Sequence, residues 1–147
     1  MKSNKSDYLK YWRVIRYFVK AKYKVTQADL DVILFLYSEQ YFGKEKFDEF
    51  NNLLSWDRGR FNRLLRDGWI HVFRKRVGKH KTLYQLSDKS INMVRLIYNK
   101  LEGEEIAMKA DNNPLFKRNV SYEDKVYRNM IKEMNSFIRQ QRHQSHE

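Results

Sequence analysis

The sequence predicts a mainly α-helical protein with one small β-hairpin, a fold of the α+β class. Apolar residues recur at helical spacing along most of the chain. Two runs rich in β-branched and aromatic residues stand on either side of Gly78, as in a hairpin. Because the chain has 147 residues, of which 41% are hydrophobic, we expect a single domain over residues 1–147 with a true core.

Four helices are predicted in the first half of the chain. They span residues 7–24, 26–43, 44–54 and 56–67. Thr26 with Asp29 resembles a capping pair for the second helix, and Ser55 stands where a cap for the fourth belongs. Gly68 is placed to end the fourth helix in a left-handed conformation. Trp56, Phe61 and Trp69 are expected in the core rather than as base-stacking groups.

The second half begins with the hairpin, whose strands are predicted at 69–76 and 81–86. A helix follows from Ser87 and Asp88 to about residue 101. Residues 103–120 contain the single proline and are expected to form a linker or an extended arm. The last helix is predicted from 121 to about 141.

Charge is distributed unevenly. Residues 54–81 carry nine basic and two acidic side chains, and residues 1–24 carry eight basic and one acidic. A formal net charge of +12 is typical of a protein that binds a polyanion. The chain lacks cysteine and has no uninterrupted apolar stretch of membrane-spanning length, so we expect a cytoplasmic protein with no membrane partner.

The order helix, turn, helix, basic hairpin is that of a winged helix-turn-helix. The arginine-rich fourth helix closes into the first strand through Asp67-Gly68-Trp69-Ile70. The second strand passes into a helix through Tyr84-Gln85-Leu86-Ser87-Asp88. On these residues the stretch from about 26 to 101 resembles the multiple-antibiotic-resistance-regulator (MarR) family of winged-helix transcription factors.

The resemblance implies a winged-helix core at residues 25–101 that binds double-stranded DNA. It also implies a homodimer, held by the terminal helices at 7–24 and 121–142. Members of that family often bind aromatic acids, so a small-molecule effector is a further expectation. Candidates to line its pocket are Tyr11, Trp12, Arg16 and Tyr37, although core packing explains the aromatic residues equally well.

The candidate DNA-binding residues divide into base readers and backbone contacts. On the fourth helix, Asn62, Arg63 and Arg66 suit base edges in the major groove. Phosphate or minor-groove contacts are expected from Arg58, Arg60, Arg74, Arg76, Lys79, His80 and Lys81. The alternative is a solvated surface helix and a hairpin whose charges only prevent edge-to-edge aggregation.

Three classes of function remain to be compared. The first is a dimeric, sequence-specific DNA-binding protein, in keeping with a transcription regulator. The second is a structural or packaging protein, such as a phage or nucleoid component, that binds nucleic acid without sequence preference. An enzyme is not expected, because the sequence has no phosphate-binding glycine loop and no recognisable nucleophile and base set. No cofactor is predicted, and no His or carboxylate cluster has the spacing of a metal site.

Overall fold

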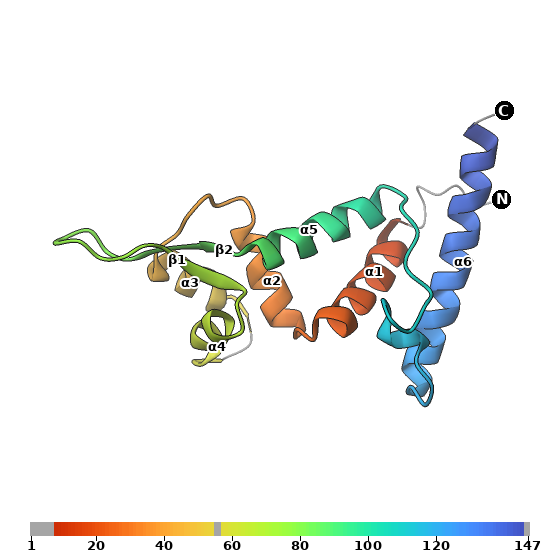
Figure 1. Ribbon diagram of the computed structural model, residues 1–147, viewed down its shortest axis with the longest axis horizontal. Coiled ribbons are helices and arrows are strands. Elements are labelled where there is room, and N and C mark those ends of the chain that lie inside the picture. Colours follow the sequence, from red (N-terminus) through yellow and green to blue (C-terminus); the bar gives the residue numbers. More distant parts are fainter. Residues whose placement is uncertain (1–7, 55–56, 146–147) are drawn as a thin grey trace. The chain divides into compact units, whose positions relative to one another are not determined.

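The computed structural model describes residues 8–54 and 57–145, which are mainly helical with a two-stranded antiparallel sheet (Figure 1). The described residues gather in two compact units. We call them the central unit (residues 25–95) and the terminal unit (residues 1–24 and 96–147). Each has its own buried apolar residues.

The central unit starts with three helices. They are α2 (Gln27–Leu36), α3 (Lys44–Asn51) and α4 (Arg60–Arg66). The predicted cap is confirmed, since the Thr26 hydroxyl accepts a hydrogen bond from the backbone N–H of Asp29 at 3.1 Å. The second helix was expected to end near Gly43. Instead α2 ends at Leu36, and Gly43 is the N-cap of α3. Ser55 and Trp56 lie outside the described residues.

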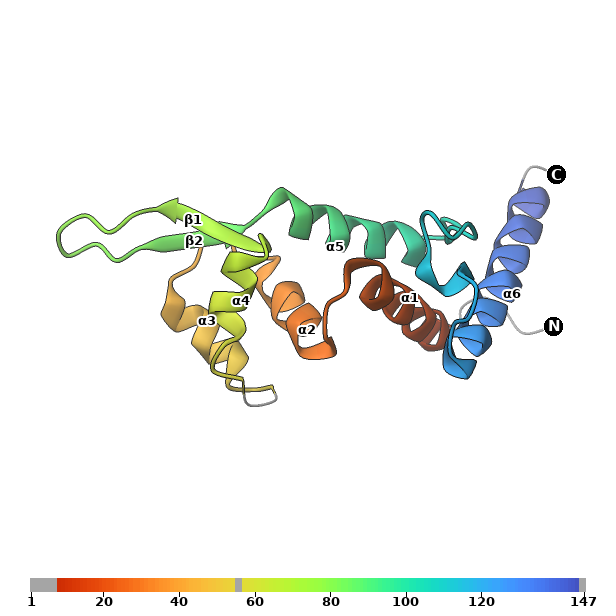
Figure 2. The same cartoon turned by 60° about the horizontal axis from the view of Figure 1, so that its bottom comes forward.

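The sheet is a hairpin of β1 (Ile70–Arg74) and β2 (Leu83–Leu86). The Cα partners are Ile70 with Leu86, His71 with Gln85, Val72 with Tyr84, and Arg74 with Leu83. Phe73 has no partner on β2 and therefore forms a β-bulge. Beyond the paired strands, residues 75–82 form a long tip that extends past the helices of the central unit in both views (Figures 1 and 2).

Two backbone features attach the hairpin to the helices. Gly68 has a φ of +82°, which confirms the left-handed end predicted for α4 and turns the chain toward β1. Phe42, just before α3, pairs with Tyr84 of β2 through two backbone hydrogen bonds of 2.8 and 2.7 Å. The segment between α2 and α3 thus adds one strand-like residue to the edge of the sheet.

The core of the central unit is apolar and comes from every element of that unit. Leu30 and Ile33 of α2 are fully buried, as are Phe47 of α3 and Leu64 of α4. Phe61 and Trp69 are also buried, as the sequence predicted. The first part of α5 (Asp88–Leu101) completes this core with Met93 and Val94.

The terminal unit is built on α1 (Tyr8–Tyr23), α6 (Tyr122–Ser145) and a short 3₁₀ helix, η2 (Pro114–Phe116). All three contact one another. Tyr17 of α1 stacks on Tyr127 of α6, with ring centroids 3.8 Å apart, and donates a hydrogen bond of 2.5 Å to Asp124. Each terminal helix therefore covers part of the other helix's apolar stripe.

The segment predicted as a linker or extended arm, 103–120, is packed instead. Ile106, Asn113 and Leu115 are buried. The side-chain amide of Asn135 in α6 accepts a hydrogen bond from the backbone N–H of Ile106 and donates one to its C=O, at 2.9 and 2.8 Å. A polar side chain on α6 thus fixes this segment much as a neighbouring strand would.

None of the described helices combines the length and the apolar content that crossing a membrane requires.

Candidate nucleic-acid interface

The arginines of α4 do not all face solvent, which corrects the prediction for Arg60. Its side chain is only 3% exposed. The Nε atom donates a hydrogen bond of 3.0 Å to Asp29 of α2, and the guanidinium also bonds the Asn51 side chain of α3. Arg60 therefore joins three helices inside the central unit and is not presented to a phosphate.

Arg63, predicted as a base reader, lies between two carboxylates. Its Nη2 atom is 2.6 Å from Asp29, and its Nη1 atom is 2.9 Å from Asp57. The hydrogen bond to Asp29, followed by the one to Asp57, raises the pKa of Arg63, while the hydrogen bond from Arg63 lowers the pKa of Asp57. With 30% of its side chain exposed, Arg63 remains at the surface, but its donors are largely in use.

Asp29, which was predicted only as part of a helix cap, is also a structural anion. Asp29 is 5% exposed and shares a face of α2 with Ile33 and Leu36, four and seven residues further on. A carboxylate on a buried face requires a cationic partner, because an unpaired buried charge is strongly unfavourable. In the sequence, the position of Asp29 on the apolar face of its helix was therefore the sign of a buried ion pair.

The other three candidates before and on α4 are exposed: Arg58, Asn62 and Arg66. Arg66 lies 3.1 Å from the carboxylate of Asp67, and both side chains remain largely in contact with solvent. Exposed pairs of this kind are weak, so Arg66 can exchange Asp67 for another anion. Asn62 and Arg66 are thus the predicted base readers that α4 presents.

The hairpin is exposed at every residue from His71 to Lys81. Its end is closed by two backbone hydrogen bonds of 3.0 Å between Val77 and His80, and Gly78 between them has a φ of +57°. The basic tip is therefore an ordered turn.

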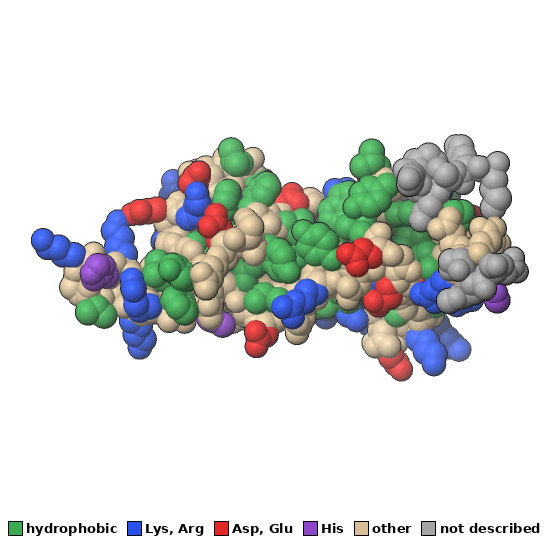
Figure 3. Space-filling view, turned by 90° about the horizontal axis from the view of Figure 1, so that it is seen from above, with side chains coloured by type: hydrophobic (Ala, Val, Ile, Leu, Met, Phe, Trp, Pro, Cys, Tyr) green, Lys and Arg blue, Asp and Glu red, His purple; other side chains and the backbone are tan. Residues whose placement is uncertain are grey.

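The cations of the hairpin are Arg74, Lys75, Arg76, Lys79 and Lys81. Lys75 was not among the predicted site residues, although it belongs to the same basic run. Lys81 forms an ion pair with Glu45 of α3, which lowers the pKa of Glu45. Across the described residues, no carboxylate pairs with Arg74, Lys75 or Lys79. Figure 3 shows Lys and Arg side chains gathered around the end of the hairpin, with a His among them.

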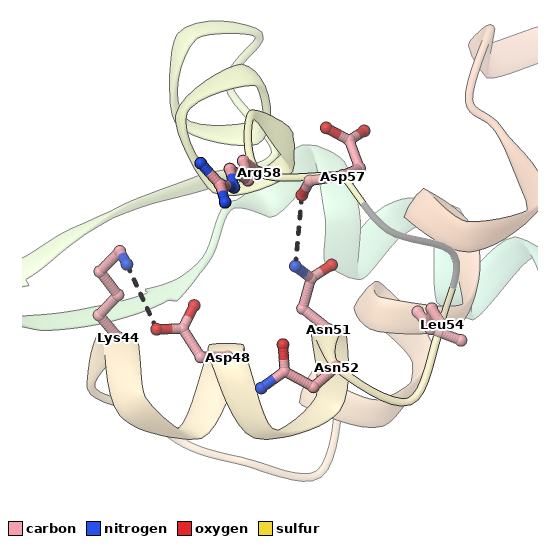
Figure 4. Close-up of a pocket in the computed structure, with 7 residues that line it drawn as sticks. All are labelled: Lys44, Asp48, Asn51, Asn52, Leu54, Asp57 and Arg58. Atoms are coloured by element: carbon pink, nitrogen blue, oxygen red, sulfur yellow. Dashed lines mark hydrogen bonds and ion pairs between the residues drawn. The ribbon is translucent and has the colours of Figure 1, made fainter.

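A polar hollow of about 540 Å³ lies between α3 and the turn that precedes α4 (Figure 4). Its lining consists of Lys44, Asp48, Asn51, Asn52, Leu54, Asp57 and Arg58. Lys44 pairs with Asp48 at 3.3 Å, and Asn51 donates a hydrogen bond to the backbone C=O of Asp57. Since cations and carboxylates balance, the hollow has no preference for an anion.

The residues considered for an effector pocket belong to different units. Tyr11, Trp12 and Arg16 are in the terminal unit and Tyr37 is in the central unit. The Arg16 guanidinium lies 5.8 Å from the Trp12 ring centroid, and the Tyr11 ring is 6.4 Å from that of Phe137. These contacts agree with a packing role, and the effector pocket stays a prediction.

Comparison of the chain with protein-family models, curated proteins and solved structures found no significant match. The resemblance to the MarR family therefore stays a prediction. Function is inferred from the side chains that the central unit exposes.

Proposed function

We propose that the central unit binds double-stranded DNA as a winged helix, with α3 and α4 as the helix-turn-helix pair and the β1–β2 hairpin as the wing. One observation carries the proposal: the hairpin is exposed from residue 71 to 81 and bears five Lys and Arg side chains, of which only Lys81 has a carboxylate partner among the described residues. Such a surface attracts a polyanion.

The order of the elements supports the winged-helix assignment. A helix, a strand-like residue at Phe42, two more helices and a hairpin follow one another, and Phe42 pairs with the second strand of that hairpin. In winged-helix proteins the second helix of the pair enters the major groove. In this chain that helix is α4, which exposes Asn62 and Arg66.

The proposed roles follow from exposure and pairing. Asn62 and Arg66 read base edges, where asparagine pairs with adenine and arginine with guanine. Arg58 contacts phosphate. The hairpin residues Arg74, Lys75, Arg76, Lys79 and His80 hold the backbone or enter a narrow minor groove, whose negative potential attracts cations.

The ion pairs of Arg60 and Arg63 favour a second candidate function, which is nucleic-acid binding without sequence preference in a structural or packaging protein. The carboxylates that pair with Arg63 engage one of the three predicted base readers of α4, and Asp29 engages Arg60, a predicted phosphate contact, while the hairpin cations are unchanged. Phosphate contacts carry affinity but no sequence information.

Selection of bound sequences from random duplex DNA at near-physiological salt tests both functions. An enriched motif supports sequence-specific binding, retention without enrichment supports the second function, and no retention refutes both. With a motif in hand, Asn62→Ala should relax the preference at one base position. Lys79→Ala should instead weaken binding to all sequences and reduce the slope of log K against log salt by about 1. Lys125→Ala, at an exposed position of α6, is the matched control.

A dimeric transcription regulator remains the more detailed form of the first proposal. Two copies joined through the terminal units would read half-sites about one DNA turn apart. Light scattering in the presence and absence of DNA tests the dimer, and a monomer bound to a single half-site would refute it.

A further inference from the structure

Two aromatic side chains lie stacked at the base of the cationic hairpin. The rings of Tyr41 and Phe73 are 5.1 Å apart between centroids and only 5° from parallel. Tyr41 is 46% exposed and Phe73 is 49% exposed. Because each ring covers only one face of the other and both residues are about half exposed, the pair offers further stacking surface to a planar group.

The pair is held by backbone features on both sides. Phe73 is the bulged residue of β1, without a partner on β2, and bulges redirect side chains. Tyr41 precedes Phe42, whose two backbone hydrogen bonds to Tyr84 fix the α2–α3 segment against β2. The hairpin and this segment thus bring together two rings that are 32 positions apart in the sequence.

The surroundings of the pair are cationic. Phe73 is followed directly by Arg74, Lys75 and Arg76. Base stacking on aromatic side chains next to a positive backbone groove is the common mode by which proteins hold single-stranded nucleic acid.

We propose that the Tyr41–Phe73 pair stacks an unpaired nucleobase, so that the preferred ligand is duplex DNA with an adjacent single-stranded segment. This inference rests on the proposed DNA binding of the central unit. The hairpin cations hold the phosphates of the duplex, and the rings receive a base that has left the stack. A planar partner explains why the rings stay exposed instead of joining the core.

The central unit offers a matched control pair. The ring centroids of Phe35 in α2 and Phe50 in α3 are 5.3 Å apart, and Phe35 is 42% exposed. Lys46 lies over the ring of Phe50 and also pairs with Glu49. Phe35→Leu therefore removes a similarly exposed ring outside the hairpin.

The experiment compares a fluorescein-labelled blunt duplex with the same duplex carrying a short single-stranded thymidine extension. Binding of the full-length protein and its variants is measured by anisotropy, and folding is checked by circular dichroism. The wild-type protein should bind the extended duplex about tenfold more tightly, the effect of stacking one base. Phe73→Leu should abolish this preference without weakening blunt-duplex binding, Phe73→Trp should keep it, and Phe35→Leu should leave it unchanged.

The outcomes separate the inference from the function on which it rests. If neither probe binds the wild-type protein, the proposed function fails. If both probes bind equally, or if Phe73→Leu keeps the preference, DNA binding stands and the stacking role is overturned. A 2-aminopurine placed in the extension gives a second readout, because stacking on the pair should quench its fluorescence in the wild-type complex and not in the Phe73→Leu complex.

Discussion

Replacing Asp29 by asparagine tests the buried ion pairs of the central unit. Asp29→Asn keeps the shape of the side chain but removes the charge that faces Arg60 and Arg63. The side chains of Asp29 and Arg60 are 7% and 3% exposed, so the arginine cannot recover its hydration without local opening. The substitution thus removes the main anionic partner of the buried Arg60 guanidinium.

The expected magnitude follows from what remains around Arg60. Breaking a buried ion pair by removing one partner costs about 3–5 kcal/mol. Arg60 retains the Asn51 side chain and the Asp57 carboxylate, which lies 3.7 Å from its Nη2 atom. We therefore expect the lower end, a loss of about 3 kcal/mol in the free energy of unfolding.

Urea denaturation followed by circular dichroism measures this loss. Glu49→Gln is the control, because the Lys46–Glu49 pair is exposed and its removal should change stability by less than about 0.5 kcal/mol. Asp29→Leu combined with Arg60→Met should recover more than half of the loss, since an apolar pair replaces the charges. If Asp29→Asn is as stable as Glu49→Gln, the buried ion pair is refuted as a stabilising element.

Three further predictions concern other parts of the chain. Asn135→Ala should lower the free energy of unfolding by about 3 kcal/mol, because the buried N–H and C=O of Ile106 lose their partners; urea denaturation measures this. Burial and then a hydrogen bond to a carboxylate raise the pKa of Tyr17. The protonated Tyr17 hydroxyl therefore stabilises the fold fully below a pH of about 10, and this stabilisation declines at higher pH. In Tyr17→Phe that decline should be absent when the free energy of unfolding is measured up to a pH of about 11. Gly68→Ala should cost about 1 kcal/mol because φ is +82°, whereas Gly43→Ala, at a φ of −86°, should cost less in the same thermal denaturation assay.

The sequence was sufficient where structure is local. Thr26 caps α2, Gly68 ends α4 in a left-handed conformation, and the turn at 77–80 closes the hairpin, since each depends on neighbouring residues only. The mainly helical class with one hairpin was predicted for the same reason.

Long-range pairing could not be predicted from periodicity. The basic run of the fourth helix predicted a phosphate contact for Arg60, but it contained no information on α2, which brings Asp29 from 31 positions away. Likewise, the polar segment that precedes α6 looked like a linker because the side chain that anchors it, Asn135, lies 29 positions beyond Ile106. In both cases a polar residue on a buried face was the sign of a distant partner.

The ion pair between Lys81 and Glu45 gives the cationic hairpin an internal counterion. The hydrogen bond from Lys81 lowers the pKa of Glu45, which favours the ionised form of this counterion. A phosphate that binds Lys81 must then displace a carboxylate of the protein itself rather than a salt ion from solution, and Arg63 stands in the same relation to Asp29 and Asp57. The salt dependence of binding would therefore report fewer cations than the surface carries, because some of them are neutralised before any ligand arrives.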